Sequence, residues 1–158
     1  MTSKSVTEIN QKEVINIDTY KKTVQFMLNN YKNIKAEIKN MLIEIEDIKN
    51  SYRGIGAIKY SDMPKSNNIS SSVEKEIEQK EKRIEYLSQL LTKKENQIKR
   101  IDNALETLSE EEYNLIKMCY FDKVKVKDAA IKLDVTEQTI CRNKSIILNK
   151  IIPIIFIE

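Results

Sequence analysis

The chain of 158 residues is long enough for one ordinary domain, or for a small globular unit joined to an elongated element. Its 2 Gly and 2 Pro are too few to supply the many turns of a β-sandwich, a barrel or an α/β sheet, so an all-α fold is expected. The net charge of +3 is too small to indicate a nucleic-acid partner by itself, and without His no Ser/His/Asp triad can form.

A seven-residue repeat of apolar residues begins at Ile17 and predicts a first long helix without a break. Asp18 is expected to cap the start of this helix, and Gly54 and Gly56 to end it. Residues 1–16 lack the repeat and are expected to form a flexible N-terminus. The repeat places Ile17, Val24, Tyr31, Ile38, Ile45 and Tyr52 in one seam and Tyr20, Met27, Ile34, Met41 and Ile48 in the other.

Residues 53–72 contain both glycines, Pro64 and a cluster of Ser and Asn, so they are expected to connect two helices without regular structure. A second heptad run follows, and Lys80 and Lys94 interrupt one of its seams. Lysines there restrict register and partner number, unless the seam is open to solvent. The apolar seam residues are Ile77, Ile84, Leu91, Ile98 and Leu105 in one row and Leu87, Ile101 and Leu108 in the other.

Two helices of similar length joined by one loop predict a long antiparallel coiled-coil hairpin over residues 17–108. Parallel dimerisation through one or both helices is the alternative. The charged outer faces of these helices are expected to be solvated surfaces stabilised by pairs four residues apart.

A small helix-turn-helix domain is predicted over residues 109–151. Ser109 and Glu112 form a capping box, which predicts a helix over residues 110–121. After a short link of alternating Lys and Val, a second helix begins at about Lys127. In it Ala129 and Ala130 allow close helix crossing, Asp134 lies at the turn, and Thr136 caps the next helix. Apolar contacts are expected from Ile131 and Leu133, from Val135 as a buried plug, and from the stripe Ile140, Ile147, Leu148 and Ile151.

Polar residues cluster at the start of the last helix. Helix-turn-helix proteins direct this part of the helix to base edges in the major groove, where Gln pairs with adenine, Arg with guanine, and Glu accepts from cytosine. Between residues 123 and 150 seven Lys or Arg face three Asp or Glu, an excess typical of phosphate contacts. A plain helical hairpin in a three-helix core is the alternative. The predicted base-reading residues are Thr136, Glu137, Gln138, Thr139, Cys141 and Arg142, and the predicted phosphate contacts are Lys123, Lys125, Lys127 and Lys144.

The runs L-S-E-E-E-Y-N-L-I-K-M-C-Y-F, D-A-A-I-K-L-D-V-T-E-Q-T-I and I-L-N-K-I resemble region four of bacterial sigma factors, which recognises the −35 promoter element. The resemblance covers residues 108–151, under a third of the chain. It implies base reading by Glu137, Gln138, Cys141 and Arg142. The family has Gly where this chain has Asp134, and it often has Arg at several of the base-reading positions, so a different target sequence is expected.

The layout of the whole chain is similar to that of phage-encoded activators of the ArpU and RinA type, with paired helices around a G-I-x-A-I-x-Y-S-D-M-P loop and no segment like sigma region two. This resemblance implies a transcription activator that acts with host RNA polymerase. The expected partners are duplex DNA, RNA polymerase and a second copy of the chain. The alternatives are a small terminase subunit for DNA packaging, and a coiled-coil adaptor that binds RNA polymerase and not DNA.

No enzyme, cofactor or metal site is expected. Without His, the 2 Cys cannot complete the usual four-ligand zinc site, and there is no Gly-rich phosphate loop. No signal peptide or membrane-spanning run is evident, so a cytoplasmic location in a bacterial host cell is expected. Pro153 is expected to end the last helix, and the apolar tail, residues 152–158, to pack on the core or form a dimer contact.

Overall fold

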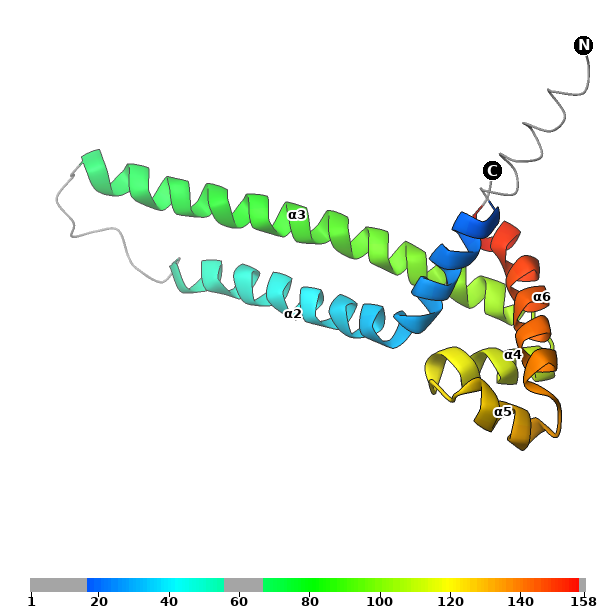
Figure 1. The fold of residues 1–158 in the computed structure, drawn as a ribbon. Coiled ribbons are helices and arrows are strands. Elements are labelled where there is room, and N and C mark those ends of the chain that lie inside the picture. Colours follow the sequence, from blue (N-terminus) through cyan, green and yellow to red (C-terminus); the bar gives the residue numbers. More distant parts are fainter. Residues whose placement is uncertain (1–16, 56–66, 157–158) are drawn as a thin grey trace, which may run out of the picture. The chain divides into compact units, whose positions relative to one another are not determined.

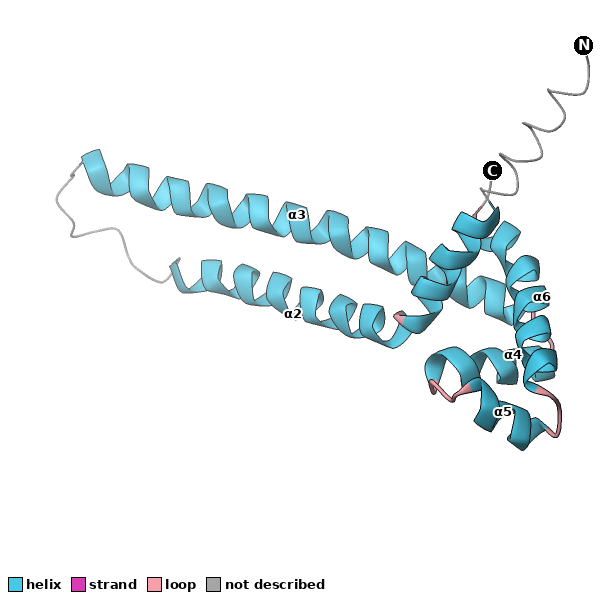
Figure 2. Ribbon diagram, in the orientation of Figure 1, coloured by secondary structure: helices cyan, strands magenta, loops and turns pink. Residues whose placement is uncertain are grey.

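A computed structural model describes residues 17–55 and 67–156. Within these ranges every regular element is a helix and none is a strand, which confirms the all-α class (Figure 2). The elements are a helix over residues 17–29, α2 (Tyr31–Ile55), α3 (Asn67–Glu106), α4 (Glu110–Ile116), the π-helix η1 (Lys117–Phe121), α5 (Val126–Leu133) and α6 (Glu137–Ile155). The predicted flexible N-terminus and most of the predicted G-I-x-A-I-x-Y-S-D-M-P loop lie outside the described residues.

The chain divides into two compact units, which differ from the predicted domains. Of the described residues, unit 1 combines residues 17–33 with residues 98–156, and unit 2 consists of residues 34–55 and 67–97. The start of the predicted hairpin, from residue 17 to residue 33, therefore belongs with the C-terminal helices. The end of the second predicted hairpin helix, from Ile98 onward, does so as well.

The first predicted helix is not continuous, because Asn30 forms a turn between residues 17–29 and α2. Both the backbone N–H and the side-chain Nδ2 of Asn30 donate to the Phe26 carbonyl, at 3.0 and 2.8 Å. An Asn side chain that bonds to the backbone competes with the helical ladder, which explains the interruption. The prediction of an unbroken helix is wrong, and so is the predicted N-cap, since Asp18 lies inside the helix.

The connection between α2 and α3 is shorter than predicted. The helix α2 continues through Gly54 to Ile55, and α3 begins at Asn67 rather than after residue 72. Ser and Asn are weak helix formers in the interior of a helix but are common near its start. The predicted loop, residues 53–72, therefore loses residues at both of its ends to the two helices.

In unit 2, α2 packs against α3 around a small core of Met41, Ile45 and Leu87 (Figure 1). Five partly buried residues surround this core, namely Ile38, Ile48, Ile84, Leu90 and Leu91. All of these apart from Leu90 occupy predicted seam positions. The heptad pattern thus identifies which faces of the two helices meet.

Two ion pairs join α2 to α3 across unit 2. Glu37 accepts from Lys94 at 2.6 Å, and Glu44 accepts from Arg83 at 2.7 Å. Because the partner's number falls as the position on α2 rises, the two helices run antiparallel within this unit. Lys94 is one of the two lysines that interrupt the predicted seam, and its side chain is only partly exposed.

The core of unit 1 is built from both ends of the chain. Val24 and Leu28 from the first helix are fully buried, together with Ile101 from α3 and Ile116 from α4. The largest contribution comes from α6, whose buried residues are Ile140, Ile147, Leu148, Ile151 and Ile155. Leu28 lies outside both predicted seams, so the first helix buries a wider stripe than a two-stranded coiled coil requires.

Aromatic contacts attach the N-terminal segment to the rest of unit 1. The rings of Tyr20 and Phe156 lie 4.7 Å apart, and those of Tyr31 and Phe121 stack at 4.8 Å. The Tyr31 hydroxyl also donates to Asp102 of α3 at 2.5 Å. Residues 17–33 are therefore part of the framework that supports α6.

Candidate nucleic-acid interface

The capping box predicted at the start of α4 is confirmed and also reaches α6. The backbone N–H of Glu112 donates to the Ser109 hydroxyl at 3.3 Å, and the Ser109 N–H donates to the Glu112 carboxylate at 2.9 Å. Lys150 of α6 donates to the same carboxylate oxygen at 2.7 Å. These bonds, that of Lys150 above all, lower the pKa of Glu112. One carboxylate thus caps α4 and ties it to α6.

The predicted helix over residues 110–121 widens into the π-helix η1 after Ile116. This turn buries Tyr120, and the Lys144 ammonium lies over the Tyr120 ring at 4.8 Å from its centre. Burial raises the pKa of Tyr120, and it also raises the pKa of the Cys119 thiol. The contact places Lys144 beside an aromatic ring in unit 1, so its predicted role at a DNA phosphate is weaker than that of a fully exposed lysine.

Three of the predicted phosphate contacts lie at the entrance to α5. Lys123, Lys125 and Lys127 are all exposed. Lys123 adopts a left-handed backbone with φ 51°, and the next N–H bonds back to the Met118 carbonyl at 3.0 Å. Lys125 is the N-cap of α5 and provides no side-chain bond to its first turn. Three lysines and one carboxylate, that of Asp128 in the first turn, therefore lie at a helix N-terminus without a side-chain cap. Their net positive charge suits an anion.

The turn between α5 and α6 has the predicted backbone geometry. Asp134 is left-handed at φ 52° and ψ 47°, and the Val135 N–H bonds to the Ala130 carbonyl at 3.0 Å. Asp tolerates this region better than most residues with a Cβ, so it can replace the expected glycine. Ala129 and Ala130 are buried, as predicted.

The apolar residues next to this turn are more exposed than predicted. Val135, expected to be a buried plug, is 40% exposed, and Ile131 is 71% exposed. Leu133 is exposed too. Because the α5 face that turns inward is that of Ala129 and Ala130, the rotation of about 100° per residue carries Ile131 away from the core. The predictions for Ile131, Leu133 and Val135 are therefore wrong.

Thr136 caps α6, as predicted, and Thr139 takes part in the same cap. The Thr139 N–H donates to the Thr136 hydroxyl at 3.2 Å, and the two hydroxyls lie 2.8 Å apart. These bonds account for much of the hydrogen-bonding capacity of both hydroxyls. Of the predicted base-reading residues, Thr136 and Thr139 therefore have a clear structural role at the helix start.

The other four predicted base-reading residues are exposed, and helical periodicity separates them into two rows. Gln138 and Arg142 begin a row that remains exposed along α6. Glu137 and Cys141 begin a neighbouring row that runs towards Leu148, which is buried. The exposed stripe consists of Gln138, Arg142, Ile146, Asn149 and Pro153, at spacings of four, four, three and four residues.

Pro153 does not end α6, which continues to Ile155. The proline removes the bond that would reach the Asn149 carbonyl, and both residues are exposed, so water can replace the missing donor. Beyond the proline, the bond from the Phe156 N–H to the Ile152 carbonyl is intact at 2.9 Å. The prediction that Pro153 ends the helix is wrong. Ile155 is buried, in agreement with the predicted alternative that the tail packs on the core.

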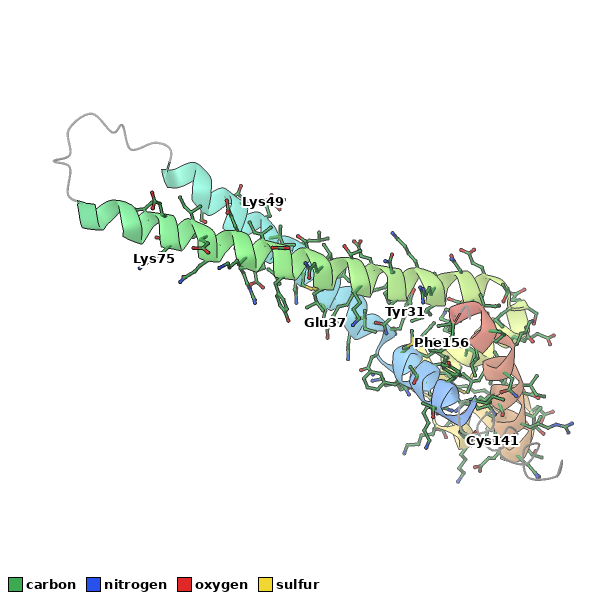
Figure 3. The ribbon with its side chains drawn as sticks, turned by 90° about the horizontal axis from the view of Figure 1, so that it is seen from above. Tyr31, Glu37, Lys49, Lys75, Cys141 and Phe156 are labelled. Atoms are coloured by element: carbon green, nitrogen blue, oxygen red, sulfur yellow. The ribbon has the colours of Figure 1, made fainter. Side chains whose placement is uncertain are left out.

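Sequence reasoning missed three members of the exposed stripe, Ile146, Asn149 and Pro153. Their spacing from Arg142 placed them on one helix face, but nothing in the sequence showed that this face is uncovered. It also missed the role of the first helix in supporting α6. In Figure 3, Cys141 and Phe156 mark two points on this C-terminal segment, and Phe156 makes the contact with Tyr20 described above.

A comparison with protein-family models found no match for this chain, and neither did searches of curated proteins and of solved structures. Among the residues that the structure describes, no helix is long and apolar enough to cross a membrane. The same residues contain no group of three or more His, Cys, Asp or Glu that could hold a metal ion.

Proposed function

We propose that this protein is a sequence-specific DNA-binding regulator of transcription, which acts at promoters together with a bacterial RNA polymerase. The observation that carries the proposal is the exposed stripe on α6, which starts with Gln138 and Arg142 directly after a capped turn. A polar helix face at this position of a helix-turn-helix is the part that enters the major groove.

The two leading residues of the stripe fit base edges. Arg142 can donate two parallel bonds to O6 and N7 of a guanine, and Gln138 can bond to N6 and N7 of an adenine. Neither side chain has a hydrogen bond or ion pair among those found for the described residues. Glu137 and Cys141 lie in the neighbouring row, at the edge of the helix face that would contact the bases.

The lysines at the entrance to α5 fit a second kind of contact. Lys123, Lys125 and Lys127 are exposed within five residues of each other, next to the N-terminus of α5. Phosphate contacts of this kind fix the position of a protein on DNA without reading its sequence. Their loss should weaken binding to all duplexes and flatten the salt dependence.

The first test is selection of duplexes from a random pool by the full chain, followed by titration of the selected duplex. Arg142→Ala is expected to cost about 1 to 3 kcal/mol on the selected site and much less on random DNA. Arg100→Ala is the matched control, because it removes the same charge from an exposed position on α3. No enrichment of any sequence, or equal losses in the two variants, would contradict the proposal.

The second test separates a regulator from other DNA-binding roles. Footprints on a promoter that contains the selected site are measured with and without bacterial RNA polymerase. A transcription regulator should alter the polymerase footprint or its occupancy. A footprint that is indifferent to polymerase would favour a packaging role, and one that appears only with polymerase and survives Arg142→Ala would favour the adaptor.

A further inference from the structure

One isoleucine of α6 differs from the others in its surroundings. Ile140, Ile147, Ile151 and Ile155 are at most 3% exposed, whereas Ile146 is 53% exposed. Single exposed apolar residues are common on protein surfaces and alone mean little. Ile146, however, lies in the same row as Gln138 and Arg142, one helical turn after Arg142.

We infer that Ile146 reads the C5-methyl group of a thymine one or two base pairs from the base contacted by Arg142. This inference rests on the proposed function. Thymine is the one DNA base that presents a methyl group in the major groove, and apolar side chains recognise it by direct contact. Glutamine, arginine and isoleucine in a single row then form one continuous reading surface.

The geometry sets where this thymine lies. Ile146 follows Arg142 by four residues, or about 6 Å along the helix axis. Base pairs are spaced by about 3.4 Å, so the thymine is expected one or two pairs from the base that Arg142 contacts. The row continues to Asn149, which is exposed.

5-Methylcytosine carries the same methyl group at the same ring position, so the chemistry alone would accept either base. The two bases that carry this methyl group can be distinguished on the selected site. Replacing thymine by uracil removes only the methyl group, and replacing cytosine by 5-methylcytosine adds one. We expect Ile146 to read thymine in the selected sequence.

The experiment uses the full chain and the duplex selected by it. Each thymine within the site is replaced in turn by uracil, and the dissociation constant is measured by fluorescence anisotropy. One position should weaken binding of the unaltered protein by about three- to five-fold, the effect of burying one methyl group. Ile146→Ala should bind the thymine duplex more weakly and should no longer distinguish it from the uracil duplex.

The ratio of two affinities does not depend on the fraction of protein that is folded, so partial unfolding of the variant cannot imitate the result. Ile43→Ala is the matched control, since Ile43 is 58% exposed on α2 of unit 2, and it should retain the full preference for thymine. Ile146→Val should retain part of it.

The outcomes separate the two proposals. Failure to select any sequence overturns the proposed function. Selective binding with an unchanged thymine-to-uracil ratio in Ile146→Ala overturns this inference and leaves the proposed function intact. If 5-methylcytosine in place of cytosine strengthens binding, and uracil in place of thymine has no effect, the choice of thymine is also overturned.

Discussion

The two units of this protein bury their apolar side chains to different depths. The largest side chains with less than 2% exposure, Leu28, Ile101, Ile116, Ile140, Leu148, Ile151, Ile155 and Val24, all belong to unit 1. The buried residues of unit 2, such as Met41 and Ile45 at 8%, are still touched by solvent. Several helices can enclose a core on all sides, whereas two helices leave the edges of their interface exposed to solvent.

Besides its small apolar seam, unit 2 has two ion pairs between partly exposed groups, Glu37 with Lys94 and Glu44 with Arg83. Exposed pairs of this kind contribute about 0 to 1 kcal/mol each, so they do not offset the missing burial. We therefore expect unit 1 to resist unfolding more strongly and unit 2 to open locally first. The supporting frame of the proposed DNA-binding surface lies in unit 1, the unit that we expect to be more stable.

The largest effect is expected from a pair of leucines at equivalent heptad positions. Leu28 in unit 1 is fully buried, and Leu42 in unit 2, two heptads later, is 48% exposed. Leu28→Ala should cost about 3 to 4 kcal/mol of unfolding free energy, since it leaves a cavity in a closed core. Leu42→Ala should cost about 0.5 kcal/mol or less.

Urea denaturation of both variants measures this difference. Similar losses in the two variants would show that the first helix continues as a coiled coil with equal packing along its length. In that case the assignment of residues 17–33 to unit 1 would have no energetic meaning.

Local features of the fold were predictable from the sequence. The scarcity of Gly and Pro predicted an all-α chain, and the capping box at Ser109 depends only on residues three positions apart. The same holds for the Thr136 cap and for the left-handed Asp134. Each of these depends on the backbone and on neighbours within one turn, which the sequence contains in full.

Features that depend on distant partners were not predictable. The heptad repeat places Val24 and Ile45 in the same seam, yet they belong to different units. The repeat describes which face of a helix is apolar and not what covers it. The exposure of Val135 and Ile146 has the same origin, because only the packing of the other helices decides which apolar residues of α6 and of the turn before it remain exposed.

A change of intermediate size should come from the seam of unit 2. Replacing Lys94 by Leu removes an ion pair and adds an apolar side chain at a seam position that is already partly buried. Glu37 remains half-exposed and solvated, so the gain in burial should exceed the loss by about 1 kcal/mol.

Hydrogen exchange of the α2 and α3 amides measures this gain where it is expected. Lys93→Leu is the control, because Lys93 is exposed and lies outside the seam. Slower exchange in Lys94→Leu but not in Lys93→Leu would show that the substitution stabilises unit 2 and reduces the difference in stability between the two units. Faster exchange would mean that the pair with Glu37 stabilises unit 2 more than apolar burial could.

The smallest effect is expected from the ion pair between Glu112 and Lys150 in unit 1. It tests whether an ion pair contributes more to the unfolding free energy there than in unit 2. Glu112→Gln preserves the shape of the capping box, since Gln also fits this position, but removes the charge that Lys150 contacts. The folded-state pKa of Glu112 lies below its ordinary value of 4.5, so its contribution is complete above that pH and is lost as the pH falls through the folded value. Glu112→Gln should therefore lower the unfolding free energy by about 0.5 to 1 kcal/mol at neutral pH, and the difference should vanish in acid.

Denaturation at pH 7 and in steps below pH 4.5 separates this charge effect from a defect in packing. Glu111→Gln is the matched control, because it removes a neighbouring exposed carboxylate of the same first turn that has no partner among the ion pairs found. A deficit in Glu112→Gln that persists at low pH would assign its effect to the cap itself. An equal and pH-dependent deficit in Glu111→Gln would assign the effect to the helix dipole, since the first turn of α4, at its positive end, carries three acidic residues.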